Sequence, residues 1–229
     1  MQPSTLTTGD SSRSCEIRLV CLEVGDQELL RLRGYLSEAE LRRGNRLLDP
    51  KRRDDFFVGR GILRELLGDI LGKQPAAIEL TEGEFGKPQL GHHQGGIDFN
   101  VSHAGSLLLA AFTQGRRVGV DLELLQPDLA FRPMAERYFS TREREELFSL
   151  PQEEQLAAFY RCWTRKEAYL KGTGSGFSRP STEFDVSLLP GEPAALLEHR
   201  GIPGEIGRWR FEETEVPEGY CASLAVELK

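Results

Sequence analysis

Two carboxylates stand two residues apart in the apolar segment 118–124. A β-strand places alternate side chains on opposite faces, so Asp121 and Glu123 would share one face and the apolar residues the other. Neighbouring carboxylates repel each other unless water or a cation lies between them. The segment therefore indicates either a solvated strand face or one part of an oxygen-rich cation site.

A third carboxylate interrupts the apolar face of a helix predicted over residues 153–171. This face runs from Leu156 through Trp163 at helical spacing and then reaches Glu167. A carboxylate buried alone is costly, so this position needs a cationic partner or a metal ion. Lys171 lies one turn further on and could pair with Glu167 as an ordinary salt bridge on the helix surface.

If the strand faces this helix, Asp121, Glu123 and Glu167 form a cluster of three carboxylates. Such a cluster suits Mg²⁺, which binds through few carboxylates and completes its shell with water and phosphate oxygens. The sequence holds no thiol or histidine cluster that would compete for a softer metal. These three residues are therefore the candidate metal ligands.

Basic side chains are concentrated in two segments of a chain whose formal net charge is −7. Residues 42–64 have a local charge of +5, and residues 157–182 have one of +4. Charge runs are usually solvated helix faces. Next to a predicted metal site, however, clustered positive charge favours a phosphate-rich ligand and an acidic partner.

The composition excludes several classes of function. With 39% hydrophobic and 28% charged residues, the 229-residue chain can build a core, and its acidic balance argues against general binding of nucleic acid. No apolar run approaches the ~20 residues of a membrane-spanning helix. Residues 1–14 lack the features of a secretory signal and are expected to form a flexible tail. The four scattered cysteines favour reduced thiols in a cytoplasmic protein.

Two further patterns argue against other enzyme classes. Ser102 stands next to His103, but no ordered third residue completes a hydrolase triad. The segment 172–176 is rich in glycine but lacks the spacing of a Walker-type phosphate loop.

Helices and strands are both expected, without a steady alternation of the two, and this mixture is typical of the α+β class. Ser37 is a candidate N-cap, and Gly72 is expected to end a long helix. The expected strands are 16–24, 77–80 and 220–228, with a hairpin of 107–112 and 118–125; the expected helices are 54–71, 143–150 and 153–171.

Four motifs, in this order along the chain, resemble those of the Sfp-type 4′-phosphopantetheinyl transferases. They are Phe85-Gly86-Lys87-Pro88, Phe99-Asn100-Val101-Ser102-His103, Gly119-Val120-Asp121-Leu122-Glu123 and Phe159-Tyr160-x-x-Trp163-x-x-Lys166-Glu167-Ala168-Tyr169-x-Lys171. The resemblance spans residues 36–185, and the chain length fits the long, pseudo-dimeric class of this family.

The resemblance implies an α+β fold of two similar subdomains related by a pseudo-twofold axis. Coenzyme A and Mg²⁺ are then expected in the cleft between the subdomains. We expect the tail at 1–14, the first subdomain at 15–105 and the second at 106–229. Because such an internal pseudo-dimer supplies both walls of the cleft, we expect a monomer.

The resemblance also assigns roles to individual residues. It implies that Asp121, Glu123 and Glu167 hold the metal. Glu167 would act as general base, directly or through a metal-bound water, while Lys171 and His103 stabilise charge on the leaving side. The residues expected to bind coenzyme A are Lys51, Arg53, Arg60, Lys87, Ser102, His103 and Lys171. For the 3′-phosphate, Lys51 is the first candidate, and Arg43, Arg52 and Arg53 are the alternatives.

The implied reaction transfers 4′-phosphopantetheine from coenzyme A to a serine of an apo acyl or peptidyl carrier protein and releases 3′,5′-ADP. Two alternatives remain, a Mg²⁺-dependent phosphohydrolase or nuclease and a non-catalytic module that binds carrier proteins. Carriers of this kind are expected to be acidic, so the basic stretch 157–182, with Arg165 and Arg179 as examples, is the expected docking surface.

Overall fold

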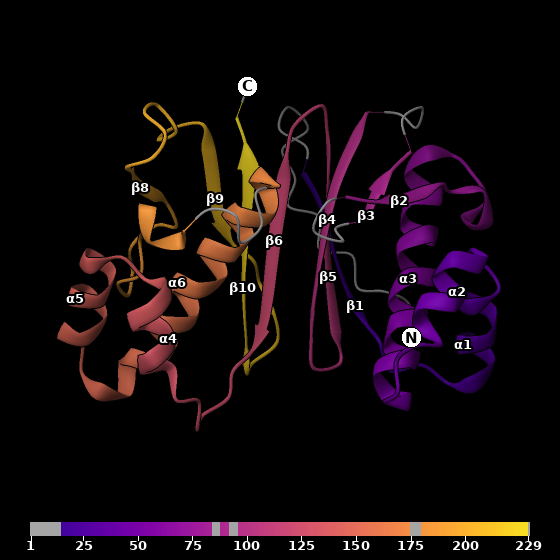
Figure 1. The fold of residues 1–229 in the computed structure, drawn as a ribbon, viewed down its shortest axis with the longest axis horizontal. Helices are drawn as coiled ribbons and strands as arrows, with labels where there is room; N and C mark the ends of the chain where they lie inside the picture. Colours follow the sequence, from indigo (N-terminus) through magenta and orange to yellow (C-terminus); the bar gives the residue numbers. More distant parts are fainter. Residues whose placement is uncertain (1–14, 84–87, 92–95, 175–179, 229) are drawn as a thin grey trace.

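Two three-stranded antiparallel sheets lie side by side in the centre of the molecule, and helices cover their outer faces (Figure 1). This computed structural model describes residues 15–83, 88–91, 96–174 and 180–228. The first half contains β1 (Cys15–Cys21), α1 (Asp26–Arg33), α2 (Glu38–Gly44), α3 (Pro50–Leu71), a 3-10 turn (Pro75–Ala77), β2 (Leu80–Glu82), β3 (Pro88–Leu90), β4 (Ile97–Ala104) and β5 (Leu107–Gln114). The second half contains β6 (Val118–Leu124), α4 (Phe131–Tyr138), α5 (Thr141–Ser149), α6 (Gln152–Thr173), a 3-10 turn (Ser181–Glu183), β7 (Phe184–Val186), β8 (Leu196–His199), β9 (Trp209–Glu213) and β10 (Tyr220–Glu227).

The two halves repeat one topology. In each, a first strand leads into three helices, a 3-10 turn, a two-stranded ribbon and two final strands. The sheet order is β1-β5-β4 in the first half and β6-β10-β9 in the second, so the last strand of each half lies in the middle of its sheet. The α+β class expected from the sequence is confirmed, and the topology repeats as the family resemblance implied.

The repeat extends to a buried ion pair. Ser37 and Ser140 each begin a capping box at the second helix of their half, and the box is closed by Glu40 and Glu143. Glu40 pairs with Arg64 of α3 at 2.7 Å, and Glu143 pairs with Lys166 of α6 at 2.8 Å.

The cation of each pair also donates hydrogen bonds to the backbone of the segment that follows its own helix, α3 or α6. The Arg64 guanidinium donates to the carbonyl oxygens of Pro75 and Ile78, and the Lys166 ammonium donates to those of Ser181 and Phe184. Each half therefore ties its second helix, its third helix and the following turn together by one cation.

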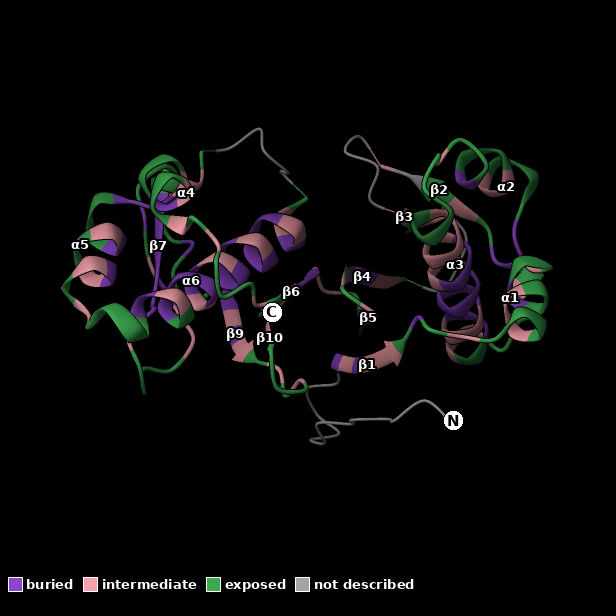
Figure 2. Ribbon diagram, turned by 90° about the horizontal axis from the view of Figure 1, so that it is seen from below, coloured by how far each residue is buried: buried purple, intermediate pink, exposed green. Residues whose placement is uncertain are grey.

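Three apolar clusters form the core. One packs α3 against the first sheet, and a second packs α6 with α4 and α5 against the second sheet. The third lies between the sheets, where Ile17 and Leu109 from the first half meet Val120 and Leu224 from the second. Figure 2 shows the buried residues concentrated on the central strands and the inner faces of α3 and α6, while α1, α2, α4 and α5 expose their outer faces. No helix among the described residues is both long and apolar enough to cross a membrane.

The expected hairpin between 107–112 and 118–125 is wrong. β5 pairs instead with β1 and β4, and β6 pairs with β10. The β4–β5 hairpin turns at Gly105 and Ser106, where Gly105 has a φ of +55°, a conformation that glycine adopts without strain.

Strand pairing also moves the boundary between the halves. A division between residues 105 and 106 would separate the paired strands β4 and β5, whereas the sheets change over in the segment 115–117.

The expected strand at 77–80 is also wrong. Residues 75–77 form the 3-10 turn, and strand β2 begins only at Leu80. Pro75 fixes the backbone of that turn at its first position.

Two helices were not predicted from the sequence. These are α1 and α4, which have eight residues each and are too short for a clear periodic signal.

Candidate functional site

The backbones of β6 and α6 touch at a pair of glycines. A Cβ atom on Gly119 would lie 1.9 Å from the carbonyl oxygen of Ala168 and 2.3 Å from the nitrogen of Gly172. Only glycine fits such a contact. The close approach brings the strand that carries Asp121 against the helix that carries Lys171.

Asp121 and Lys171 form the centre of the site. The Lys171 ammonium lies 2.5 Å from Oδ1 of Asp121 and donates a hydrogen bond of 3.0 Å to Oγ of Ser102. The Ser102 hydroxyl lies 3.1 Å from the same Asp121 oxygen. Asp121 is only 3% exposed, whereas the side chain of Lys171 is 30% exposed, so the ion pair is buried on the side of Asp121 alone. Lys171 thus pairs with Asp121 of β6, and its charge also acts on Glu167 of its own helix.

The two glutamates face the same centre. Burial, and then the Asp121 carboxylate, raise the pKa of Glu167 to about 7, although Lys171 opposes this effect. Burial and Asp121 also raise the pKa of Glu123. Because Asp121 and Glu123 both raise the pKa of Glu167, the structure brings the three predicted carboxylates into electrostatic contact.

Trp163 is a site residue whose role the sequence did not indicate. Its indole N–H donates a 3.1 Å hydrogen bond to Oε1 of Glu123. In the sequence, Trp163 continues the apolar face of the helix, and nothing there distinguishes a packing tryptophan from one that orients a carboxylate.

The site is not a preformed metal cage. Within the described ranges, no group of three carboxylate, imidazole or thiol side chains is gathered closely enough to hold a metal ion. The donor chemistry nevertheless fits a hard cation, because all three side chains supply oxygen. In addition, Oδ2 of Asp121 is buried without a hydrogen-bond partner. A buried carboxylate oxygen of this kind has room for one more positive ligand.

His103 does not join this centre. Along β4, Ser102 faces β6 and the carboxylates, whereas His103 is the next residue and points to the other face of the strand. His103 is exposed and pairs in register with Leu108, whose side chain lies against Gly59 of α3. The structure therefore places His103 on the side of the first half's helices.

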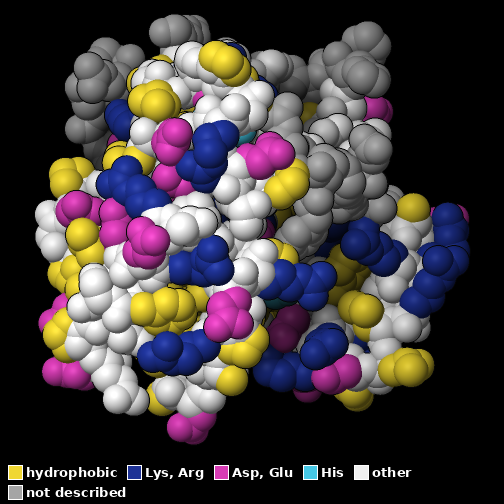
Figure 3. Space-filling view, turned by 60° about the vertical axis from the view of Figure 1, so that its left-hand side comes forward, with side chains coloured by type: hydrophobic (Ala, Val, Ile, Leu, Met, Phe, Trp, Pro, Cys, Tyr) yellow, Lys and Arg dark blue, Asp and Glu magenta, His cyan; other side chains and the backbone are white. Residues whose placement is uncertain are grey.

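The predicted coenzyme A-binding cations of α3 also lie apart from the carboxylates. Lys51 is exposed and pairs with Asp55 at 2.8 Å, while Arg53 lies 3.7 Å from Asp54. Figure 3 shows dark-blue cationic side chains gathered toward the side of the first half's helices. The remaining predicted phosphate contact, Lys87, lies outside the described residues.

Arg60 lies further along α3, and its guanidinium packs over the Phe56 ring at 5.5 Å. The Arg43 guanidinium of α2 approaches the same ring at 5.6 Å. Burial is the main cause that lowers the pKa of Arg60; Glu40, whose carboxylate lies 3.6 Å from the Arg60 guanidinium, opposes this effect, and the neighbouring Arg43 adds to it. Two cations thus lie at one ring, and one of them is paired with Glu40.

Two cations of the basic stretch 157–182 are not available to the expected docking surface. Arg165 is completely buried, donates to Ser187 and pairs with Glu213, and Lys166 is 2% exposed in its pair with Glu143. Arg179 lies outside the described residues. A net charge counted along a helix does not say which face each cation occupies, and here Arg165 and Lys166 turn inward.

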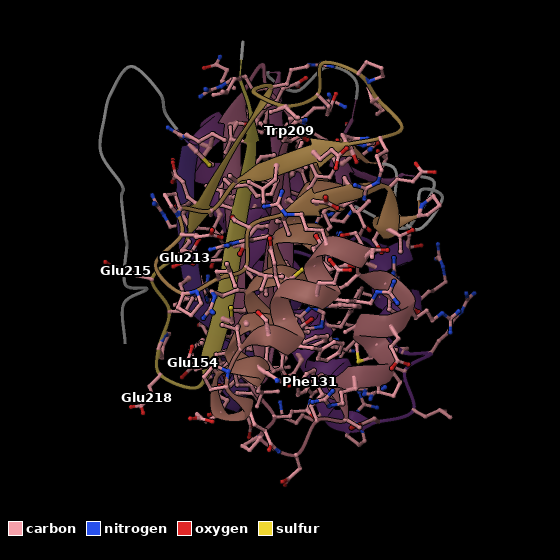
Figure 4. The ribbon with its side chains drawn as sticks, turned by 90° about the vertical axis from the view of Figure 1, so that its left-hand side faces the viewer. Phe131, Glu154, Trp209, Glu213, Glu215 and Glu218 are labelled. Atoms are coloured by element: carbon pink, nitrogen blue, oxygen red, sulfur yellow. The ribbon has the colours of Figure 1, made fainter. Side chains whose placement is uncertain are left out.

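The outer edge of the second half is acidic. Glu215 and Glu218 lie in the connection from β9 to β10, next to Glu213 at the end of β9, whose carboxylate pairs with Arg165, and Glu154 lies near the start of α6 (Figure 4). An acidic partner would be repelled from this edge.

Known proteins resemble this chain over most of its length. The sequence model of the 4′-phosphopantetheinyl transferase superfamily matches residues 117–225. The 4′-phosphopantetheinyl transferase HetI of Nostoc sp. is 42% identical over 76% of this chain and 74% of its own. The 4′-phosphopantetheinyl transferase Sfp of Bacillus subtilis is 30% identical over 67% of this chain and 72% of its own.

Solved structures give a more distant match. The holo-[acyl-carrier-protein] synthase of Thermotoga maritima is 20% identical with a TM-score of 0.39, and it covers 49% of this chain and 63% of its own. The identity to HetI, extending over about three quarters of both chains, confirms what the four motifs indicated. This chain belongs to the 4′-phosphopantetheinyl transferase superfamily, whose members transfer phosphopantetheine from coenzyme A to carrier proteins.

Proposed function

We propose that the reaction takes place at the contact between β6 and α6, with the residue roles given below. The observation that carries this proposal is the 2.5 Å contact of Asp121 with the Lys171 ammonium, together with the electrostatic influence of both residues on Glu123 and Glu167. The hydroxyl oxygen of a carrier-protein serine attacks the β-phosphorus of coenzyme A. The bond from that phosphorus to the bridging oxygen breaks, and 3′,5′-ADP leaves with the bond's electron pair.

Asp121, Glu123 and Glu167 are the residues that would hold Mg²⁺, and the unpartnered Oδ2 of Asp121 supports this assignment. When bound, Mg²⁺ neutralises negative charge on the pyrophosphate and favours in-line displacement. Trp163 supports the set because its indole N–H fixes the orientation of Glu123.

Glu167 accepts the proton of the serine hydroxyl. Without metal, burial and the neighbouring carboxylates raise the pKa of Glu167 to about 7. Bound Mg²⁺ would lower this pKa and keep the carboxylate ionised, in the form that accepts a proton directly or through a metal-bound water. Lys171, held by Asp121 and Ser102, places its positive charge where the leaving phosphate gains negative charge.

Coenzyme A spans the two halves in this proposal. Lys51, Arg53, Arg60 and His103 on the first half bind its phosphates, with Lys87 as a further contact from the sequence. Because the face of His103 is opposite to that of Ser102, we assign His103 to binding and not to charge stabilisation at the leaving group. Ser102 and Lys171 approach from the seam between the halves.

The partners are coenzyme A and an apo acyl or peptidyl carrier protein, and we propose that the enzyme acts as a cytoplasmic monomer. The apolar cluster between the two sheets supports the monomer, because the interface that two separate subunits would form is already made within one chain. The carrier docks away from the acidic edge at Glu213, Glu215 and Glu218.

Mass spectrometry of an apo carrier protein tests the proposal directly. After incubation with this protein, coenzyme A and Mg²⁺, the carrier should gain one phosphopantetheine group on its serine, and 3′,5′-ADP should appear in equal amount. Omission of Mg²⁺ and the Glu167→Gln variant are the controls. Release of inorganic phosphate or cleavage of nucleic acid, with the carrier unmodified, would favour the phosphohydrolase or nuclease alternative.

A further inference from the structure

The strands β4 and β6 lie side by side at the seam between the halves but belong to different hydrogen-bonded sheets. Side chains of β4 cross this seam. Oδ2 of Asp98 accepts a hydrogen bond from the backbone N–H of Val118 at 2.9 Å, and Oδ1 of Asn100 accepts one from the N–H of Val120 at 2.9 Å. These acceptors replace the carbonyl groups of a neighbouring strand along this edge of β6.

Ser102 continues the same row toward the candidate site. Asp98, Asn100 and Ser102 alternate along β4 and therefore share one face. The Ser102 hydroxyl contacts Oδ1 of Asp121 at 3.1 Å and accepts a hydrogen bond from the Lys171 ammonium. We name Asp98, Asn100 and Ser102 the seam row.

Asn100 is the residue of the seam row that binds the backbone next to Asp121. It binds the N–H of Val120, the residue directly before Asp121, and both Asn100 and Val120 are buried. If the amide oxygen were lost, a buried N–H would be left without a partner, and β6 would shift to satisfy it. A shift at Val120 moves Asp121 relative to Ser102, which belongs to the other strand.

We propose that Asn100 is a positioning residue of the transfer reaction, which fixes Asp121 opposite Ser102 and Lys171 through the N–H of Val120. The inference rests on the proposed function, because it takes Asp121 as a residue of the reactive centre. Asn100 does not touch the substrates in this account, and its effect passes through the backbone of β6.

Asp98 provides a matched comparison within the same seam row. It makes the same kind of hydrogen bond to the same strand, but to Val118, which is three residues from Asp121. Asn100→Leu and Asp98→Leu each remove one acceptor and keep a side chain of similar size. A purely structural role predicts equal losses of activity for equal losses of stability, whereas a positioning role does not.

The experiment measures transfer kinetics and Mn²⁺ binding for wild type and both variants, at a temperature well below each melting temperature. For Asn100→Leu we expect kcat to fall about 10- to 100-fold and the Kd for Mn²⁺ to rise by a similar factor, as when a residue supporting a metal ligand is lost. The KM for the carrier should stay close to that of wild type. Asp98→Leu should keep both kcat and the Mn²⁺ affinity near the wild-type values, even at a comparable loss of melting temperature.

Equal effects of the two variants on kcat and on Mn²⁺ binding, with active wild type, would overturn the positioning role and leave the proposed function intact. An Asn100→Leu variant that lowers only the melting temperature would do the same. A wild-type protein that neither loads the carrier nor binds Mn²⁺ would overturn the proposed function itself, and this inference with it.

Discussion

The third helices of the two halves are alike in length and in their buried cation, but they differ at the next residue. Both α3 and α6 have 22 residues, and in both the fifteenth is the cation of the repeated ion pair, Arg64 or Lys166. Each cation is followed by a glutamate. In the first half Glu65 pairs with Arg31 of α1, whereas in the second half Glu167 faces Asp121 and Glu123.

The first strands differ in the same way. β1 and β6 have seven residues each, and the fourth is Arg18 in β1 and Asp121 in β6. Arg18 pairs with Glu16 on its own strand, whereas Asp121 lies beside the two other carboxylates. The two halves thus share one topology. At these positions the charges of the first half are neutralised by neighbouring side chains, whereas the second half has an excess of negative charge. The ion pair that both halves share therefore stabilises the fold, whereas the candidate reactive residues lie in the second half, where the carboxylates outnumber the cations.

The largest effect should separate the two equivalent glutamates. We expect Glu167→Gln to lower kcat for carrier loading by at least about 10²-fold, because it removes a group that acts on the reacting atoms. Glu65→Gln should leave kcat near the wild-type value. Comparable losses in the two variants would show that the halves share the chemistry and that our assignment to the second half is wrong.

The repeated ion pairs should differ in their contribution to stability. Glu143→Ala leaves the almost completely buried Lys166 without its counter-charge, which should cost about 3–5 kcal/mol of unfolding free energy. Glu40→Ala removes the carboxylate partner of both Arg64 and Arg60, but the side chain of Glu40 retains 12% exposure, so water can replace it beside these cations and we expect a smaller loss. Urea unfolding measures both, and a larger loss for Glu40→Ala would contradict this order.

Stability should also depend on pH through Glu167. Its pKa is near the ordinary value for glutamate in the unfolded chain and about 7 in the folded protein, so the folded state binds the proton more tightly. This contribution is fully present below pH 4.5, and it is lost as the pH rises to about 7, with a total of up to about 3 kcal/mol. In metal-free buffer, Glu167→Gln should therefore lose less stability than wild type between pH 5 and 8. Parallel pH profiles of the two proteins would contradict the raised pKa.

The smallest effect concerns the first half as a binding surface. Lys51→Ala should weaken coenzyme A binding by about ten-fold, as expected for one charge-assisted phosphate contact. Binding of 3′-dephospho-coenzyme A should change little. If affinity falls equally for both ligands, Lys51 does not contact the 3′-phosphate, and Arg43, Arg52 and Arg53 become the candidates.

Periodicity alone identified the three carboxylates, because an acidic residue on an apolar helix face and two on one strand face are visible in the sequence. It failed where a contact depends on another element. The contact of Lys171 with Asp121 follows from the close approach of Gly119 to α6, which no local pattern reveals. Arg165 was expected at the surface because charge was counted along the chain and not around the helix.

Local sequence patterns likewise could not predict which strands pair with each other. The segment 113–117 has the composition of a hairpin turn, yet it joins two sheets. Local patterns did not reveal the repeated topology, which the family resemblance implied and which the two sheet orders show.

The apolar contact between the two sheets is formed by segments of a single polypeptide, connected through residues 115–117. Its assembly is therefore a unimolecular event with a high effective concentration, and dilution does not oppose it. Two separate chains with the same contact would part once their concentration fell below the dissociation constant. Here the two sides of the seam keep their alignment however few copies of the protein are present.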